Sequence, residues 1–171
     1  MELLPGDPAP TTLALVAGLA LIETIEDFAG NAPLILKWPN DLLLEGAKLA
    51  GILLERSGDR IVVGFGVNLA SGPSLPDRPT ATLGGAVGPQ DFTPLIAASF
   101  ARWLNQWRSG TADDLSSDWL ARAHPIGTPL SVHGAGAERV SGTFAGLEAD
   151  GALRLQTAQG IETIRAGDVE L

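Results

Sequence analysis

Residues 37–55 constrain the fold of this 171-residue chain more than any other segment. The stretch holds the only lysines of the chain, Lys37 and Lys48, and threads them with Asn40 and Asp41 through otherwise apolar sequence. Turn-forming residues interrupt the apolar runs twice, so no run is long enough for a helix. The pattern therefore predicts a bent strand, a tight hairpin and a returning strand.

The two lysines would flank one hairpin in this arrangement. An unpaired charge is costly to bury, so Lys37 and Lys48 at the ends of apolar strands call for a negative partner. A phosphate or carboxylate between two partly desolvated ammonium groups is held more strongly than in water, and Asp41 is close enough in sequence to orient one of them. The alternative is that both lysines extend from the surface of the hairpin and that Asp41 only forms the turn.

A second hairpin is predicted from residues 48–56 and 60–69, which are joined by a short turn sequence. Gly64 and Gly66 interrupt its second strand, and glycine inside a strand often lies where a ligand or another backbone comes close. A bulge that bends the strand is the alternative. Asn68 could present its amide to the edge of an adenine ring, or it could cap its own backbone.

Two linked motifs in this region resemble the central signature of biotin protein ligases. They are Lys-Trp-Pro-Asn-Asp-Leu at residues 37–42 and Lys-Leu-Ala-Gly-Ile-Leu at residues 48–53, followed by Glu55. Gly-Phe-Gly-Val-Asn-Leu at residues 64–69 is similar to the Gly-x-Gly-x-Asn strand of that family. The resemblance implies that biotin and ATP react to biotinyl-5'-AMP and pyrophosphate, and that biotin then passes to a lysine of a biotin carboxyl carrier protein.

The resemblance also implies roles for individual residues. Lys48 would bridge the biotin carboxylate and the α-phosphate as the main catalytic residue, and Lys37 would hold phosphate oxygens. Asp41 would orient the lysines or a magnesium-bound water, which makes ATP and Mg²⁺ the implied cofactors and biotin the substrate. The residues implied in ATP or adenylate binding are Asn40, Gly64, Gly66 and Asn68. The residues implied in biotin binding are Lys48, Gly51, Ile52 and Leu53.

One part of the family pattern is absent from the sequence. The Gly-Arg-Gly-Arg-x-Gly-Arg loop of the family, and the preceding strands that read the biotin ring, do not occur here. We therefore expect a ligase truncated at its N-terminus, or one half of a split enzyme, with an exposed sheet edge that could be completed by a homodimer or by a complementing N-terminal half. The alternative function is a non-catalytic fragment that binds only nucleotide or carrier protein. The motif pair favours biotin over lipoate.

Composition excludes several other classes of protein. The formal net charge of −9 argues against nonspecific binding to nucleic acid or an anionic membrane. The chain has no cysteine, so it has neither a disulfide nor a thiolate metal site. His124 and His133 lack paired ligand spacing and are interpreted as structural or exposed. No uninterrupted apolar run reaches about 18 residues, and the cytoplasm is the expected location.

The remaining chain divides into a helical part and a β part. Helices are expected from Thr11 or Thr12 to Gly30, over 80–87, from Asp91 or Thr93 to Arg108, and over 115–123, with a loop at 70–79. Strands are expected at 129–133, 139–147, 152–156 and 161–166, with turns that include 134–136. The predicted fold is α+β: a partial class II synthetase-like, biotin/lipoate ligase-type mixed sheet with packed helices at residues 1–125, then a small SH3-like β-barrel at residues 126–171.

Overall fold

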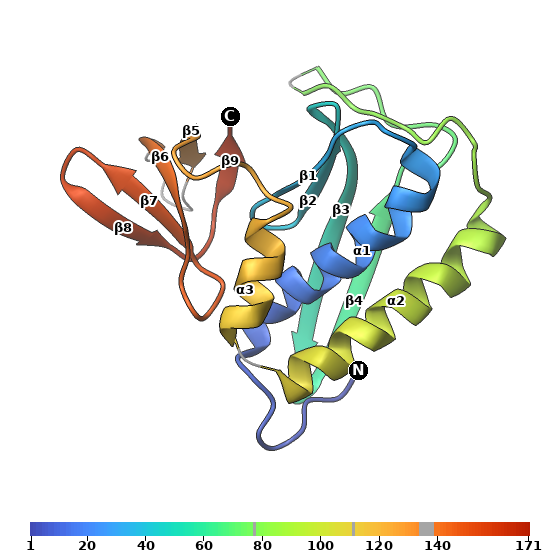
Figure 1. Ribbon diagram of the computed structural model, residues 1–171, viewed down its shortest axis with the longest axis horizontal. Coiled ribbons are helices and arrows are strands. Elements are labelled where there is room, and N and C mark those ends of the chain that lie inside the picture. The colour runs from blue at the N-terminus through green and yellow to red at the C-terminus, as the bar shows by residue number, and fades with distance from the viewer. Residues whose placement is uncertain (77, 111, 134–138) are drawn as a thin grey trace.

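The computed structural model describes residues 1–76, 78–110, 112–133 and 139–171, and it contains two antiparallel sheets and three α-helices (Figure 1). The first sheet has the order β1-β2-β3-β4, so each strand pairs with the next along the chain. Its strands are β1 Leu34–Lys37, β2 Asp41–Leu44, β3 Ala47–Ser57 and β4 Arg60–Val67. The α+β class and the hairpins are confirmed. The described ladders of this sheet are all antiparallel, and the parallel pairings described at its strands are the isolated bridges of Leu36 with Ala123 and of Lys48 with Thr80.

Helix α1, Leu13–Ala29, is buried along most of its length. Figure 1 shows it crossing one face of the first sheet, with α2 beside it. The predicted threonine cap is not formed, because the Thr12 hydroxyl donates to the carbonyl of Ala9 at 2.7 Å and accepts from Trp107 Nε1 at 2.8 Å. Gly30 follows the helix at a φ of 60°, which a glycine adopts without steric cost.

Helix α2, Pro89–Ser109, begins before both predicted starts, two residues before Asp91 and four before Thr93. Its first residue is a proline, which lacks the N–H that would be unpaired there in any case. Helix α3 covers Ala112–Leu120, close to the predicted position. Among the described residues, no helix is both long and apolar enough to span a membrane.

The helix expected at residues 80–87 is wrong. The chain there runs beside the start of β3, where the Lys48 amide donates to the Pro79 carbonyl at 3.0 Å and the Ala81 amide donates to the Lys48 carbonyl at 2.9 Å. Gly84 and Gly85 then take φ values of 64° and 78°, which a right-handed helix does not allow. Backbone pairing to a distant strand thus replaces the local helical pattern.

The second sheet follows α3 and has the order β8-β7-β6-β5-β9. Four of its strands lie close to the predicted positions, and the short fifth strand was not predicted. The expected turn at residues 134–136 lies outside the described residues. The described pairings do not close the sheet into a barrel. The strands are β5 Pro129–His133, β6 Arg139–Leu147, β7 Leu153–Thr157, β8 Gly160–Ile164 and β9 Asp168–Glu170.

The second sheet packs against the β1 end of the first sheet (Figure 1). Trp38, which follows β1, donates from its indole Nε1 to the carbonyl of Gly151 at 3.0 Å. The Thr11 hydroxyl donates to the carbonyl of Asp150 at 2.7 Å. These contacts place the Lys-Trp-Pro-Asn-Asp motif directly at the junction between the two sheets.

Candidate functional site

The candidate site lies on the face of the first sheet opposite α1. Backbone pairing places Lys37, Asp41, Gly51 and Gly66 in one row across all four strands. Side chains alternate between the two faces of a sheet, and the adjacent row, which includes Leu42, belongs to the buried core. The Lys37 row therefore points to the open face.

A bulge brings the second lysine to the same face. Asp41 pairs with Gly51, but the register shifts between Leu42 and Leu43, so that Leu43 pairs with Lys48. Without this shift, Leu43 would pair with the residue after Lys48, and the Lys48 side chain would point toward the helices. The extra residue in β3 therefore turns Lys48 toward Asp41.

Asp41 is the centre of the charged group. Its Oδ1 accepts a hydrogen bond from Lys48 Nζ at 2.5 Å, and its Oδ2 lies 3.9 Å from Lys37 Nζ. The Asp41 side chain is only 6% exposed, against 12% for Lys37 and 30% for Lys48. A buried carboxylate between two ammonium groups is paired rather than isolated, which offsets its desolvation cost. The arrangement fixes two cations on an open surface.

The charged group continues into the second sheet. Asp168 at the start of β9 lies 3.7 Å from Lys37 Nζ through Oδ1 and 3.6 Å from an Arg78 guanidinium nitrogen through Oδ2. An open hollow of about 480 Å³ is lined by all of these charged side chains and by Leu43. Arg78 and Asp168 were not predicted from the sequence, because no motif marks them and each reaches the site only through the tertiary fold.

The two asparagines predicted to bind the adenylate make structural hydrogen bonds. Asn40 Nδ2 donates to the carbonyl of Ile52 at 2.7 Å. Asn68 Nδ2 donates to the carbonyl of Ala81 at 3.0 Å and, at 3.4 Å, to that of Lys48. Asn68 thus holds the following loop against β3 with its amide nitrogen. Its amide oxygen can accept a hydrogen bond from a ligand.

The glycines and the residues implied in biotin binding are distributed over both faces of the first sheet. Gly64 pairs with Leu53 and Gly66 pairs with Gly51, so these four residues share the open face with Lys48. A Cβ added at Gly66 would come no closer than 3.7 Å to its nearest neighbour, so this surface is uncrowded. Ile52 lies in the core instead, at 4% exposure, and the structure therefore separates it from Gly51 and Leu53.

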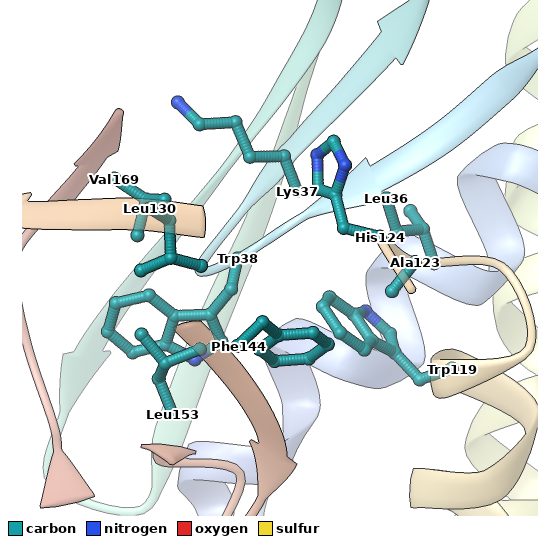
Figure 2. Close-up of a pocket in the computed structure, with 10 residues that line it drawn as sticks. All are labelled: Leu36, Lys37, Trp38, Trp119, Ala123, His124, Leu130, Phe144, Leu153 and Val169. Atoms are coloured by element: carbon teal, nitrogen blue, oxygen red, sulfur yellow. The ribbon is translucent and has the colours of Figure 1, made fainter. Parts of the chain in front are cut away.

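A narrow pocket between the two sheets lies beneath this site (Figure 2). The aromatic rings of Trp38, Phe144 and Trp119 fill its lower part, while the Lys37 side chain extends away from them. His124 lies beside Lys37, and its buried Nε2 has no hydrogen-bond partner among the described residues. Burial, and secondarily the positive charge of Lys37, lowers the pKa of His124 from its usual 6.5.

Two protein-family models match the chain. The Biotin/lipoate A/B protein ligase family matches residues 3–69, and the Biotin protein ligase C terminal domain matches residues 131–171. These segments contain both sets of strands that form the candidate site.

Named relatives match over most of the chain. A biotin--[acetyl-CoA-carboxylase] ligase of Paracoccus denitrificans is 40% identical over 179 residues, which cover 96% of this chain and 74% of the relative. A protein of the same name from Mycobacterium tuberculosis is 35% identical over 164 residues, covering 92% of this chain and 61% of the relative.

Solved structures show the same fold. The apo biotin protein ligase of Aquifex aeolicus superimposes with a TM-score of 0.82 at 23% identity, covering 95% of this chain and 76% of that protein. The Aquifex aeolicus enzyme in complex with biotin and ATP gives a TM-score of 0.79 at 24% identity, covering 94% of this chain and 71% of that protein.

Proposed function

The chain belongs to the biotin protein ligase family, and we propose that it activates biotin with ATP and transfers the biotin to a lysine of a biotin carboxyl carrier protein. The observation that supports this most directly is the Lys48–Asp41–Lys37 group, in which one buried carboxylate holds two ammonium groups on an open face. That face is lined by glycines, so a nucleotide can approach the backbone.

The first step joins two anions, and the lysines reduce the repulsion between them. A carboxylate oxygen of biotin attacks the α-phosphorus of ATP, the bond from that phosphorus to the bridging oxygen of the β-phosphate breaks, and pyrophosphate leaves. We assign Lys48 to the point where carboxylate and α-phosphate meet, and Lys37 to phosphate oxygens. Fixed cations at developing negative charge lower the barrier because they need no reorganisation during the reaction.

The second step transfers the biotinyl group. The neutral amine of the carrier lysine attacks the acyl carbon of biotinyl-5'-AMP, AMP leaves, and the new amide nitrogen loses a proton. The ammonium of Lys48 would here stabilise the negative charge that passes to the AMP phosphate. Asp41 acts on both steps by holding Lys48 in one orientation through the 2.5 Å hydrogen bond.

Asp41 is not placed to hold a magnesium ion. Both of its carboxylate oxygens face ammonium groups, and the part of the chain that the structure describes contains no group of three or more His, Asp or Glu side chains that could hold a metal. The described residues therefore do not form a cage that would hold the ion without the substrate. We propose that Asp41 orients the two lysines and that magnesium enters bound to the triphosphate of the substrate.

The division of the chain is also a proposal. We place the catalytic region at residues 1–125 and a C-terminal domain of SH3-like type at residues 126–171. The five antiparallel strands that follow α3 and the family model that matches residues 131–171 support the second region. Closure of its sheet into a barrel is part of this proposal.

The experiment that tests the function is biotin-dependent exchange of pyrophosphate into ATP, measured on the wild-type chain and on Lys48→Ala. We expect exchange in the wild type and a loss of about 100-fold or more in the variant, which corresponds to about 3 kcal/mol of barrier. Arg60→Ala is the control, because it removes an exposed cation at the far end of β4. Exchange at the wild-type rate in a folded Lys48→Ala variant would contradict the assignment.

A further inference from the structure

Arg78 is a cation of the site that the family motifs do not include. It lies in the segment between β4 and α2, and it lines the same hollow as Lys37 and Lys48. Its backbone neighbourhood is held in place, because Pro79 and Ala81 exchange hydrogen bonds with Lys48 and the Thr80 hydroxyl donates to the carbonyl of Pro73 at 2.7 Å. Backbone hydrogen bonds of its neighbours therefore place Arg78 beside the start of β3, near Lys48.

The partner of Arg78 in the structure is a carboxylate that also contacts Lys37. The two oxygens of Asp168 lie 3.7 Å from Lys37 Nζ and 3.6 Å from Arg78, and no closer hydrogen bond joins either pair. Asp168 is 56% exposed and Arg78 is 41% exposed, so water competes for both. Exposed pairs of this length contribute little to stability. Asp168 is therefore a weak bridge between two cations that another anion could replace.

The charged side chains follow one another in a definite order. Lys48, Asp41, Lys37, Asp168 and Arg78 form consecutive ion pairs at 2.5, 3.9, 3.7 and 3.6 Å. Lys37 and Arg78 share Asp168, whereas Lys48 pairs with Asp41. If Lys48 lies at the α-phosphate, as in the proposed function, a phosphate that takes the place of Asp168 between Lys37 and Arg78 would be one of those that leave the nucleotide.

We propose that Arg78 binds the terminal phosphates of ATP, the part released as pyrophosphate, and that these phosphates displace Asp168 from Arg78 and Lys37. The inference rests on the proposed function for its assignment to ATP. Two oxygens of one phosphate can take the places of the two Asp168 oxygens, and the planar guanidinium of Arg78 is well suited to phosphate. Glu170, a further carboxylate at the hollow, lies 3.1 Å from Arg139 and 3.3 Å from His133.

Calorimetric titration with pyrophosphate, ATP and AMP tests this assignment. We expect Arg78→Ala to weaken binding of pyrophosphate and ATP about tenfold or more, while AMP binding stays within about twofold. Arg165→Ala is the matched control, because Arg165 forms an exposed ion pair of nearly the same length, 3.5 Å, with Asp150. Unchanged pyrophosphate affinity in Arg78→Ala, or an equal loss for AMP, would overturn the proposal.

Asp168→Asn tests the displacement separately. Removing the competing carboxylate should strengthen pyrophosphate binding several-fold, and the gain should shrink when Arg78→Ala is also present. Asp150→Asn removes a carboxylate from the control pair and should leave the affinity unchanged. Weaker pyrophosphate binding in Asp168→Asn would show that Asp168 supports the site and would overturn the displacement.

The same preparations distinguish this inference from the proposed function. Biotin-dependent exchange in the wild type, with pyrophosphate affinity that does not depend on Arg78, would overturn only the role of Arg78. Pyrophosphate binding that depends on Arg78, in a wild-type chain without exchange, would support the phosphate site and overturn only the ligase activity.

Discussion

At the scale of single residues, Asp41 determines what the two lysines can do. Its carboxylate is nearly inaccessible and meets an ammonium group on each side. Lys48, the more exposed of the two lysines, keeps 30% of its side-chain surface and so stays available to a ligand. Electrostatic stabilisation of a transition state depends on charges that are already oriented, and Asp41 provides that orientation.

The stability of the fold should depend on pH through His124. Its pKa is lowered by burial and then by the charge of Lys37, so the unfolded chain binds a proton more readily than the folded chain. The contribution of the neutral His124 imidazole to the free energy of unfolding is fully present above pH 6.5. It is lost as the pH falls from there through the lower pKa of the folded state. We therefore expect the free energy of unfolding to decrease over this range, and His124→Gln to reduce the decrease.

Urea unfolding at several pH values between 5 and 8 measures this difference. Carboxylates contribute to the pH dependence of both proteins, so the comparison between wild type and His124→Gln isolates the histidine. Two parallel curves of unfolding free energy against pH would contradict the prediction.

At the scale of elements, the hairpins were predictable and the bulge was not. The turn residues at Glu45, Gly46 and Gly58 mark where the chain reverses, and both turn glycines have positive φ. Those local signals are enough to place β2 beside β3 and β3 beside β4. The register shift between Leu42 and Leu43 has no local signal in β2, because apolar residues occupy that strand on each side of it.

Residues that reach the site from distant segments were likewise not predictable. The motifs identified Lys37, Asp41 and Lys48, which lie on the three consecutive strands β1, β2 and β3. Arg78 is positioned by backbone pairing with β3, and Asp168 by the short strand β9, which pairs with β5. A three-residue strand carries too little periodicity to be recognised from sequence.

The glycines of β4 should be required for nucleotide binding rather than for folding. A Cβ at Gly66 has no neighbour closer than the Gly51 carbonyl at 3.7 Å, and valine favours strands, so Gly66→Val should keep the thermal midpoint of the wild type. The added side chain would stand on the open face where the nucleotide is proposed to lie. We expect the affinity for ATP to fall by about 1–3 kcal/mol, the cost typical of overpacking.

Calorimetric titration with ATP, together with thermal unfolding, checks this prediction. Val62→Thr is the control, since Val62 is 63% exposed at the far end of the same strand. Wild-type ATP affinity in Gly66→Val would place the nucleotide elsewhere, and a large loss of stability would mean that the glycine serves the fold.

At the scale of the whole molecule, the segment that carries Lys37 also forms the packing contact between the two sheets. Leu36 and Trp38 flank the lysine and are buried, the first against Ala123 and the second against Phe144 and Leu153 (Figure 2). The lysine between them points to the open face because its neighbours point into the junction. The packing of the second sheet thus sets the direction of the Lys37 side chain, which is proposed to bind phosphate.

Trp38 should therefore couple the stability of the two sheets. Trp38→Phe keeps an aromatic ring in the junction and removes the 3.0 Å hydrogen bond to the Gly151 carbonyl, which should lower the free energy of unfolding by about 1 kcal/mol. Because the bond crosses the junction, hydrogen-exchange protection should fall in β7 as well as in β2.

Trp103→Phe is the matched control, since it removes an indole hydrogen bond of 2.5 Å to Glu23 that joins α2 to α1. It should destabilise the helices without a selective loss of protection in β5–β9. Full protection of β7 in a Trp38→Phe chain that has lost stability elsewhere would contradict this prediction. It would mean that the apolar contacts alone hold the two sheets together, and that these contacts alone set the direction of the Lys37 side chain.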